Sequence, residues 1–182
     1  TVLDPACGSG NFLYVSMRAL LDLEKTVLAE CDQQGWARPA EPRVSPQNVY
    51  GIEINPYAHE LAQATVWIGY LQWRNENGYG FPPEPILRKL DNLRNMDAIL
   101  APDGSEPEWP AVDVIVGNPP FLGGSHIRRT LGDQYAELLF PSFDGRVPAS
   151  SDLVCYWLER SRVHISEGRA RRAGRGLWGG GF

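Results

Sequence analysis

The chain has 182 residues, of which 43% are hydrophobic and 21% charged, a balance typical of one globular domain with its own core. No segment contains the roughly 18 consecutive apolar residues that a transmembrane helix needs, so we expect neither a membrane protein nor a membrane partner. Three cysteines far apart in the sequence predict neither a disulfide framework nor a zinc site, and they favour a reducing, cytoplasmic location.

The net charge of −5 is unevenly distributed along the chain. Residues 160–182 hold six arginines and one glutamate, which leaves 11 basic and 21 acidic residues in the rest of the chain. Affinity for duplex DNA depends largely on the neutralisation of phosphates. The acidic body therefore predicts that any firm grip on DNA comes from another segment.

The first half of the chain alternates strand and helix patterns, which is typical of an α/β domain with a mainly parallel sheet. Val2-Leu3-Asp4 predicts the end of a first strand, and residues 48–53 predict a second strand. Asn55 followed by Pro56 is typical of a helix start, because asparagine can cap backbone N–H groups and proline lacks one. Residues 11–30 predict an earlier helix, from apolar residues at helical spacing: Phe12, Val15, Ala19, Leu20, Leu23, Val27 and Leu28.

The second half of the chain continues this alternation. A weakly marked third strand is expected near Leu93, and a buried fourth strand over residues 112–117. Residues 131–140 and 153–164 predict two helices, the second of them capped by Ser151-Asp152.

Glycine and arginine dominate residues 168–182, which hold too few apolar side chains for a packed element. We therefore expect a domain over residues 1–167 and a disordered or frameshifted tail after it. Together with a start at Thr1 inside a strand, this predicts a gene fragment with a frameshift near Gly174. In such a fragment the fourth strand would be an exposed edge of the sheet, which predicts poor solubility and no activity.

The turn after the first strand has the composition of a nucleotide-binding loop. Gly8 and Gly10 lack a Cβ, so the backbone there can adopt positive φ and approach a ligand closely. The helix that follows directs its N-terminal N–H groups at the loop, where a methionyl carboxylate is favoured. Glu53 ends the second strand and can accept hydrogen bonds from both hydroxyls of a ribose.

The spacing within this pattern disfavours a nicotinamide cofactor. A nicotinamide fingerprint has an acidic residue about 20 positions further on and a third glycine in the loop. Glu53 stands 49 residues after Asp4, and the third glycine is absent. A tight turn that binds no ligand is the alternative interpretation of the loop.

The tetrad Asn118-Pro119-Pro120-Phe121 directly follows the predicted fourth strand. The carbonyl of the Asn118 side chain and the backbone carbonyl of Pro119 can accept the two hydrogens of an amino group, which stabilises the charge that develops as its nitrogen attacks a methyl sulfonium. The prolines stiffen the segment, and Phe121 offers an aromatic face to a base outside its stack. A strand-terminating turn is the alternative. A C5-cytosine methyltransferase is excluded, since it needs a Pro-Cys pair here.

These stretches resemble the motifs of N6-adenine DNA methyltransferases that use S-adenosylmethionine. Residues 4–13 resemble their motif I, residues 51–56 their motif II, and the tetrad their motif IV. Asp97 stands where motif III has an acid that receives the amino group of the cofactor's adenine; a surface aspartate is the alternative there. Residues 1 to about 174 resemble the catalytic block of fused restriction–modification enzymes of types IIG and IIL.

The resemblance implies a class I, Rossmann-like methyltransferase sheet, here incomplete, with strands 1–4 and flanking helices. It implies methylation of a flipped adenine in double-stranded DNA, for restriction–modification or phage defence, with no metal ion and with a target-recognition domain that is absent from this chain. The implied catalytic residues are Asn118, Pro119, Pro120 and Phe121. The implied cofactor-binding residues are Asp4, Pro5, Ala6, Cys7, Gly8, Gly10, Asn11, Phe12, Glu53, Ile54 and Asp97.

Other substrates stay open at this point. The tetrad also occurs in amino-methyltransferases that act on ribosomal RNA and on a glutamine of release factors. An inactive remnant that only binds the cofactor is a further alternative.

Overall fold

A computed structural model describes residues 1–80 and 88–175 of the chain. In this part of the chain, five parallel strands form one sheet in the order β3-β2-β1-β4-β5. Because the strands are parallel, their carboxyl ends all lie at one edge of the sheet. The strands are β1 (Val2–Asp4), β2 (Val49–Glu53), β3 (Leu93–Asn95), β4 (Val114–Gly117) and β5 (Arg172–Arg175).

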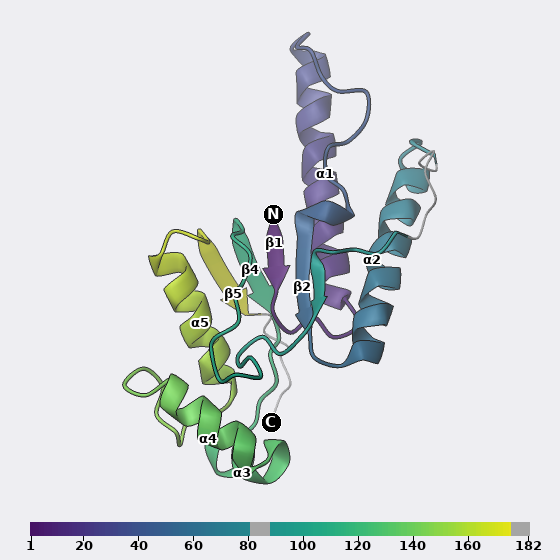
Figure 1. Cartoon of the computed structure of the whole chain (residues 1–182). Coiled ribbons are helices and arrows are strands. Elements are labelled where there is room, and N and C mark those ends of the chain that lie inside the picture. Colours follow the sequence, from purple (N-terminus) through teal and green to yellow (C-terminus); the bar gives the residue numbers. More distant parts are fainter. Residues whose placement is uncertain (81–87, 176–182) are drawn as a thin grey trace, which may run out of the picture.

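Helices lie on both sides of this sheet (Figure 1). The first two pack on one face and the last packs on the other, while α3 and α4 lie beyond the carboxyl ends of the strands. No helix in the described ranges is both long and apolar enough to cross a membrane. The helices are α1 (Asn11–Gln33), α2 (Pro56–Glu76), α3 (Gly124–Leu131), α4 (Asp133–Ser142) and α5 (Val154–Ser166), with a short 3-10 helix at Pro46–Asn48.

Two hydrophobic clusters, one on each face, hold the layers together. Successive residues of a strand point to opposite faces, and β2 shows this alternation: Val49 joins the cluster under α1 and α2, whereas Ile52 joins the cluster under α5. Trp73 and Trp109 are the largest fully buried side chains of the two clusters. Each binds a distant segment through its indole N–H, Trp73 with Asp22 (2.6 Å) and Trp109 with the carbonyl of Ala98 (2.8 Å).

The α/β class and the first four strands are confirmed, but several expectations about elements are wrong. The C-terminal segment is not free of packed structure, because residues 172–175 form β5 along β4. The fourth strand is consequently interior to the sheet, between β1 and β5, so the reason for expecting it at an edge is removed. Helix α3 was not expected. Residues 176–182 lie outside the described residues.

A further error concerns the apolar face of α1. The sequence pattern included Val15, Leu23 and Val27, which are 61%, 61% and 53% exposed. The row that faces the sheet and α2 is a second one, which shares only Leu28 with the expected set. Its buried residues are Leu13, Met17, Leu21 and Leu28.

The start of α5 also differs from the expected Ser151-Asp152 cap. The residue before the first turn is Leu153, whose side chain caps nothing. Asp152 still contributes, since its Oδ1 accepts the backbone N–H of Val154 (3.0 Å). The same oxygen accepts the N–H of Leu122 (3.1 Å), so Asp152 links this helix to the segment after the tetrad.

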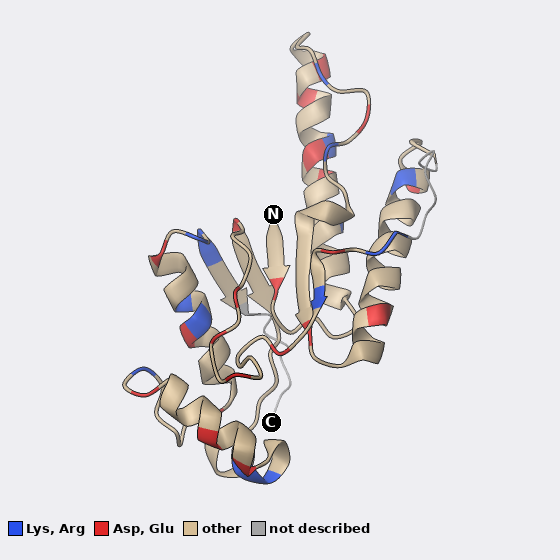
Figure 2. Cartoon of the chain, viewed as in Figure 1, with Lys and Arg blue, Asp and Glu red and all other residues tan. Residues whose placement is uncertain are grey.

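The C-terminal arginines do not form an unpaired basic surface. Figure 2 shows basic and acidic residues side by side on and around α5. Four of these arginines are ion-paired, at distances of 2.6 to 3.6 Å between charged atoms. The pairs are Arg160 with Glu106, Arg162 with Glu159, Arg169 with Glu108 and Arg171 with Asp113.

Candidate active site at the carboxyl edge of the sheet

The motif residues gather at the carboxyl edge of the sheet, around the ends of its three central strands. β1 lies between β2 and β4, so the chain leaves the centre of the sheet in opposite directions on either side of β1. Ligands of open α/β sheets bind at such a switch point. The loop after β1 and the tetrad after β4 are the two segments that meet there.

The loop after β1, residues 5–10, has the shape expected for close contact with a ligand. Gly8 and Gly10 have φ values of +54° and +88°, which residues with a Cβ rarely adopt. A Cβ on Gly10 would also lie 3.0 Å from the Cα of Ala62 in α2. No side chain of the described residues caps the first turn of α1, so its N-terminal N–H groups face the loop without such a partner.

Glu53 ties the ends of β1 and β2 together. Its Oε2 accepts the backbone N–H of Gly8 (2.9 Å), and its Oε1 accepts that of Asn55 (2.7 Å). An ionised carboxylate has about four acceptor directions, so each oxygen can still accept a further hydrogen bond. Besides the role expected from the sequence, the carboxylate thus shapes the loop itself.

Asp4 is fully buried at the end of β1. Its Oδ1 accepts the N–H of Ala6 (3.0 Å), whereas its Oδ2 has no hydrogen-bond partner in the part of the chain that the structure describes. Burial, with a smaller contribution from the charge of Glu53, raises the pKa of Asp4 to about 7. A buried carboxylate with an unpaired oxygen favours its neutral form, so Asp4 changes charge near neutral pH.

Asp4 also supports the segment that carries the tetrad. A Cβ on Gly117 would lie 2.7 Å from the Oδ1 of Asp4, so only glycine allows this approach. Asn118, the next residue, is exposed and Pro119 is buried. Pro120 is exposed, as is Phe121 at 59%. The tetrad therefore presents its amide and its aromatic ring to solvent from a backbone that rests on the end of β1.

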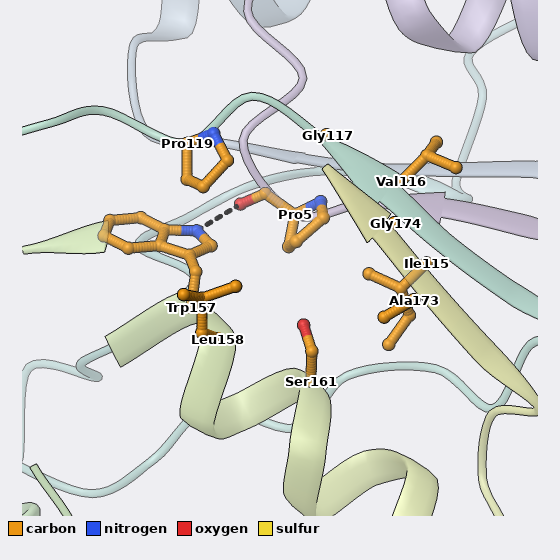
Figure 3. A pocket seen from close by; sticks show the side chains of 10 residues that line it. All are labelled: Pro5, Ile115, Val116, Gly117, Pro119, Trp157, Leu158, Ser161, Ala173 and Gly174. Carbon is orange, nitrogen blue, oxygen red and sulfur yellow. Dashed lines mark hydrogen bonds between the residues drawn. The ribbon is translucent and has the colours of Figure 1, made fainter. Parts of the chain in front are cut away.

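Trp157 of α5 connects the two segments, and no sequence motif had assigned it a role. Its indole N–H donates to the carbonyl of Pro5 (3.2 Å). Figure 3 shows the indole beside Pro5 and Pro119, and all three residues line a small apolar cavity of about 90 Å³. Leu122, the residue after the tetrad, makes two hydrogen bonds to the start of α5. Its N–H donates to Asp152, and its carbonyl accepts the N–H of Leu153 (2.8 Å).

Asp97 and Ile54 lie together on the other side of the site. Both line a cavity of about 660 Å³, a size typical of small-molecule sites. Asp97 is not a plain surface aspartate, because it is half-buried and its Oδ2 accepts the hydroxyl of Tyr135 in α4 (2.9 Å). Tyr135 is a further cavity residue that the sequence had not indicated.

The other residues that the sequence predicted to bind a cofactor take supporting positions. The thiol of Cys7 is buried, and burial followed by the charges of Asp4 and Glu53 raises its pKa, so it stays protonated and unreactive. Asn11 is the exposed first residue of α1, and Phe12 is half-buried beside it. Within the described residues, no cluster of histidine, cysteine and acidic side chains is arranged to hold a metal ion.

Comparison with known proteins gives consistent results. The family model described as MmeI, DNA-methyltransferase domain, matches residues 1–173. The chain is 33% identical to DNA methyltransferase A of Bacillus subtilis (strain 168) over 132 residues, which are 66% of this chain. The chain spans only 14% of the length of that relative.

Solved structures support the same fold. The type IIL restriction-modification enzyme MmeI in complex with DNA matches with a TM-score of 0.67 and 27% identity, over 92% of this chain and 23% of that chain. The ATP-dependent type ISP enzyme LlaBIII bound to DNA matches with a TM-score of 0.52 and 16% identity, over 91% of this chain and 12% of that chain, so that likeness concerns the fold alone. The resemblance seen in the sequence is confirmed: the chain belongs to the family of MmeI-type DNA-methyltransferase domains.

Proposed function

We propose that this domain transfers the methyl group of S-adenosylmethionine to the exocyclic N6 of an adenine in double-stranded DNA, within a restriction–modification or phage-defence protein. The observation that carries the proposal is the contact between the ends of β1 and β4, from which the two motif segments start. Gly117, the last residue of β4, lies against Asp4, the last residue of β1, and the next residue presents its amide to solvent. A methyl donor in the loop and an amino group at Asn118 would thus be neighbours.

In this proposal the loop after β1 and the first turn of α1 hold the methionyl part of the cofactor. The N–H groups of the uncapped helix start favour its carboxylate, and the glycines allow close approach. Glu53 accepts the ribose hydroxyls with the acceptor directions that Gly8 and Asn55 leave open. Ile54 and Asp97 line the pocket for the adenine.

The tetrad is proposed to act on the target base. When bound, S-adenosylmethionine would supply the methyl group: the amino nitrogen would bond to the methyl carbon as the carbon–sulfur bond breaks, S-adenosylhomocysteine would leave, and the nitrogen would lose one proton. The side-chain carbonyl of Asn118 and the backbone carbonyl of Pro119 accept the two hydrogens of that nitrogen, and so stabilise the positive charge that develops there. The base must leave the helix to reach them, and the exposed ring of Phe121 offers it a stacking surface.

Three facts favour DNA as the substrate over RNA or a protein glutamine. The chain belongs to a DNA-methyltransferase domain family, its Bacillus relative is named a DNA methyltransferase, and MmeI was solved with DNA. The acidic body and the paired arginines indicate that a separate recognition domain supplies most of the affinity for duplex DNA.

The test is a methyl-transfer assay with labelled S-adenosylmethionine and the intact protein that carries this sequence. Its substrates are duplex DNA of mixed sequence, ribosomal RNA and release factor, and the modified residue is identified after digestion. We expect label only in DNA, as N6-methyladenine. The Asn118→Ala variant should lose most turnover while its affinity for S-adenosylhomocysteine stays within about twofold, since the proposed interaction forms mainly in the transition state.

Other outcomes are equally informative. Label in RNA or in release factor would replace the proposed substrate, and cofactor binding without any transfer would identify an inactive remnant. If the Asn118→Ala variant turned over at nearly the wild-type rate, the tetrad would be only a strand-terminating turn with no catalytic role.

A further inference from the structure

The Asp97 carboxylate accepts hydrogen bonds on both of its oxygens. Its Oδ1 accepts the backbone N–H groups of Ile99 (2.7 Å) and Leu100 (3.2 Å). Its Oδ2 accepts the hydroxyl of Tyr135 (2.9 Å). Of about four acceptor directions on an ionised carboxylate, these bonds occupy three, so one direction on Oδ2 remains.

Tyr135 reaches this carboxylate from a separate element. It stands in the first turn of α4, 38 residues further along the chain. Burial, and then the charge of Asp97, raise the pKa of Tyr135, so the hydroxyl keeps its proton and acts as the donor. The bond therefore fixes which direction of Oδ2 is left for a ligand.

Asp97 and Tyr135 both line a mainly apolar cavity that is large enough for a purine ring. The cavity of about 660 Å³ lies between the end of β2, the segment after β3 and α4. Asp97 and Tyr135 line it together with mainly apolar side chains. The apolar lining residues include Ile54, Met96, Leu100, Leu131 and Leu138.

We propose that Tyr135 is a positioning residue for the purine of the cofactor: it fixes the Asp97 carboxylate so that its one remaining acceptor direction meets a 6-amino group. The inference rests on the proposed use of S-adenosylmethionine. A 6-oxo purine would point an oxygen at that acceptor, and two acceptors cannot share a hydrogen bond. A site built around a hydrogen bond rejects an analogue that cannot form it much more strongly than an apolar pocket does.

The experiment measures binding of S-adenosylhomocysteine and of its 6-oxo analogue, S-inosylhomocysteine, by calorimetry with the intact protein. We expect Tyr135→Phe to weaken S-adenosylhomocysteine binding by roughly 3- to 10-fold, the value of one hydrogen bond, and to leave the inosyl ligand within about twofold. The ratio of the two affinities falls accordingly. The Phe ring keeps the packing of Tyr135, and thermal unfolding of each variant monitors the fold.

Tyr156→Phe is the matched control. Tyr156 belongs to the same hydrophobic cluster, but its hydroxyl has no hydrogen-bond partner among the described residues and it does not line the cavity. This variant should keep the wild-type ratio. Asp97→Asn should shift the ratio toward the inosyl ligand, because an amide N–H can donate to a 6-oxo group.

The outcomes separate this inference from the proposed function. An unchanged ratio in Tyr135→Phe, with a wild type that prefers S-adenosylhomocysteine, would overturn the role of Tyr135 and leave the cofactor assignment in place. A wild type that binds both ligands equally would show that Asp97 does not accept a hydrogen bond from the 6-amino group. A wild type that binds neither would overturn the cofactor assignment and this inference with it.

Discussion

Two carboxylates at the ends of neighbouring strands differ in how many of their oxygens accept hydrogen bonds. Glu53 accepts a backbone N–H on each oxygen, whereas Asp4 is fully buried with one oxygen unpaired within residues 1–80 and 88–175. Glu53 thus organises the loop after β1 through hydrogen bonds. Asp4 fills the space under Gly117, where its ionisation is costly.

Glu53→Ala removes the acceptor for the N–H groups of Gly8 and Asn55 as well as the proposed ribose contact. We expect the affinity for S-adenosylhomocysteine to fall by about 1–3 kcal/mol, the range for hydrogen bonds to a charged group. Calorimetric titration of the intact protein measures the change. Glu53→Gln is the control, because it keeps one acceptor oxygen and should lose less. Unchanged affinity in Glu53→Ala would remove Glu53 from the site.

Asp4 predicts a dependence of stability on pH. In the folded protein its pKa is about 7, whereas the usual value is 3.8, so between these pH values the folded state keeps a proton that the unfolded state has lost. Stability contributed by Asp4 is therefore complete near pH 4, falls as the pH rises to about 7 and is then constant. At about 1.4 kcal/mol per pKa unit the fall is on the order of 4 kcal/mol.

Asp4→Asn isolates this effect from other titrating groups. The amide keeps an acceptor for the N–H of Ala6 but does not ionise. The free energies of unfolding of wild type and variant are measured with urea at pH 4.5, 6 and 8. As the pH rises, their difference should shift by a few kcal/mol in favour of the variant. A difference that does not change with pH would mean that Asp4 titrates normally.

At the scale of elements, the site depends on contacts between segments rather than on any one motif. β1 and β4 are paired neighbours, and their last residues, Asp4 and Gly117, are in contact at the point where the two motif segments begin. Asp152, just before α5, accepts the N–H of Leu122 in the segment after the tetrad, and Trp157 of α5 donates to Pro5 in the loop after β1. The exposed Asn118 and Phe121 are thus presented by a backbone fixed on both sides.

Gly117→Ala tests this arrangement. Its Cβ would lie 2.7 Å from the Oδ1 of Asp4, and Asp4 cannot move without losing its bond to Ala6. We expect a loss of about 1–3 kcal/mol in the free energy of unfolding, typical of overpacking, and a lower kcat as Asn118 shifts. Chemical denaturation and methyl-transfer kinetics measure the two effects.

The control for this variant is Gly123→Ala, in the same connection between β4 and α3. Gly123 has a φ of −52°, and an added Cβ there meets no heavy atom of the described residues within 4 Å. It should be close to wild type in both measurements. Equal behaviour of the two variants would show that the contact between Gly117 and Asp4 does not restrict the tetrad.

At the scale of the whole molecule, the charge distribution limits how tightly the domain alone can bind duplex DNA. Apart from residues 160–182, acidic residues outnumber basic ones by 21 to 11. Four of the C-terminal arginines pair with carboxylates, so their charge is partly neutralised within the domain. In the described part of the chain, the positive charge that a firm grip on phosphates requires is therefore not concentrated on one face.

We expect the 182-residue chain by itself to bind duplex DNA weakly, with a dissociation constant of about 10⁻⁴ M or higher at physiological salt, in the range of non-specific binding. Fluorescence anisotropy with a labelled duplex measures this. Lowering the salt should strengthen binding only modestly, because few phosphates are neutralised. Submicromolar binding at physiological salt would contradict this expectation and the need for a separate recognition domain.

The sequence by itself determined the α/β class, the first four strands and the positions of the motif loops. Those features depend on local composition: apolar runs in β1, β2 and β4, glycines at positive φ, and the cap at Asn55, whose side chain accepts the N–H groups of Tyr57 and Ala58. The family was also readable at this level, because its motifs are short and contiguous.

Only the tertiary structure decided which surfaces are buried and which loops meet. Residues 172–175, Arg-Ala-Gly-Arg, carry no strand pattern and form β5 because β4 offers them an unpaired edge. The choice between the two apolar rows of α1 depended on where α2 and the sheet lie. The bond between Tyr135 and Asp97 and the position of Trp157 join residues 38 and 152 positions apart in the chain. No local pattern encodes such contacts, since they form only when the layers pack.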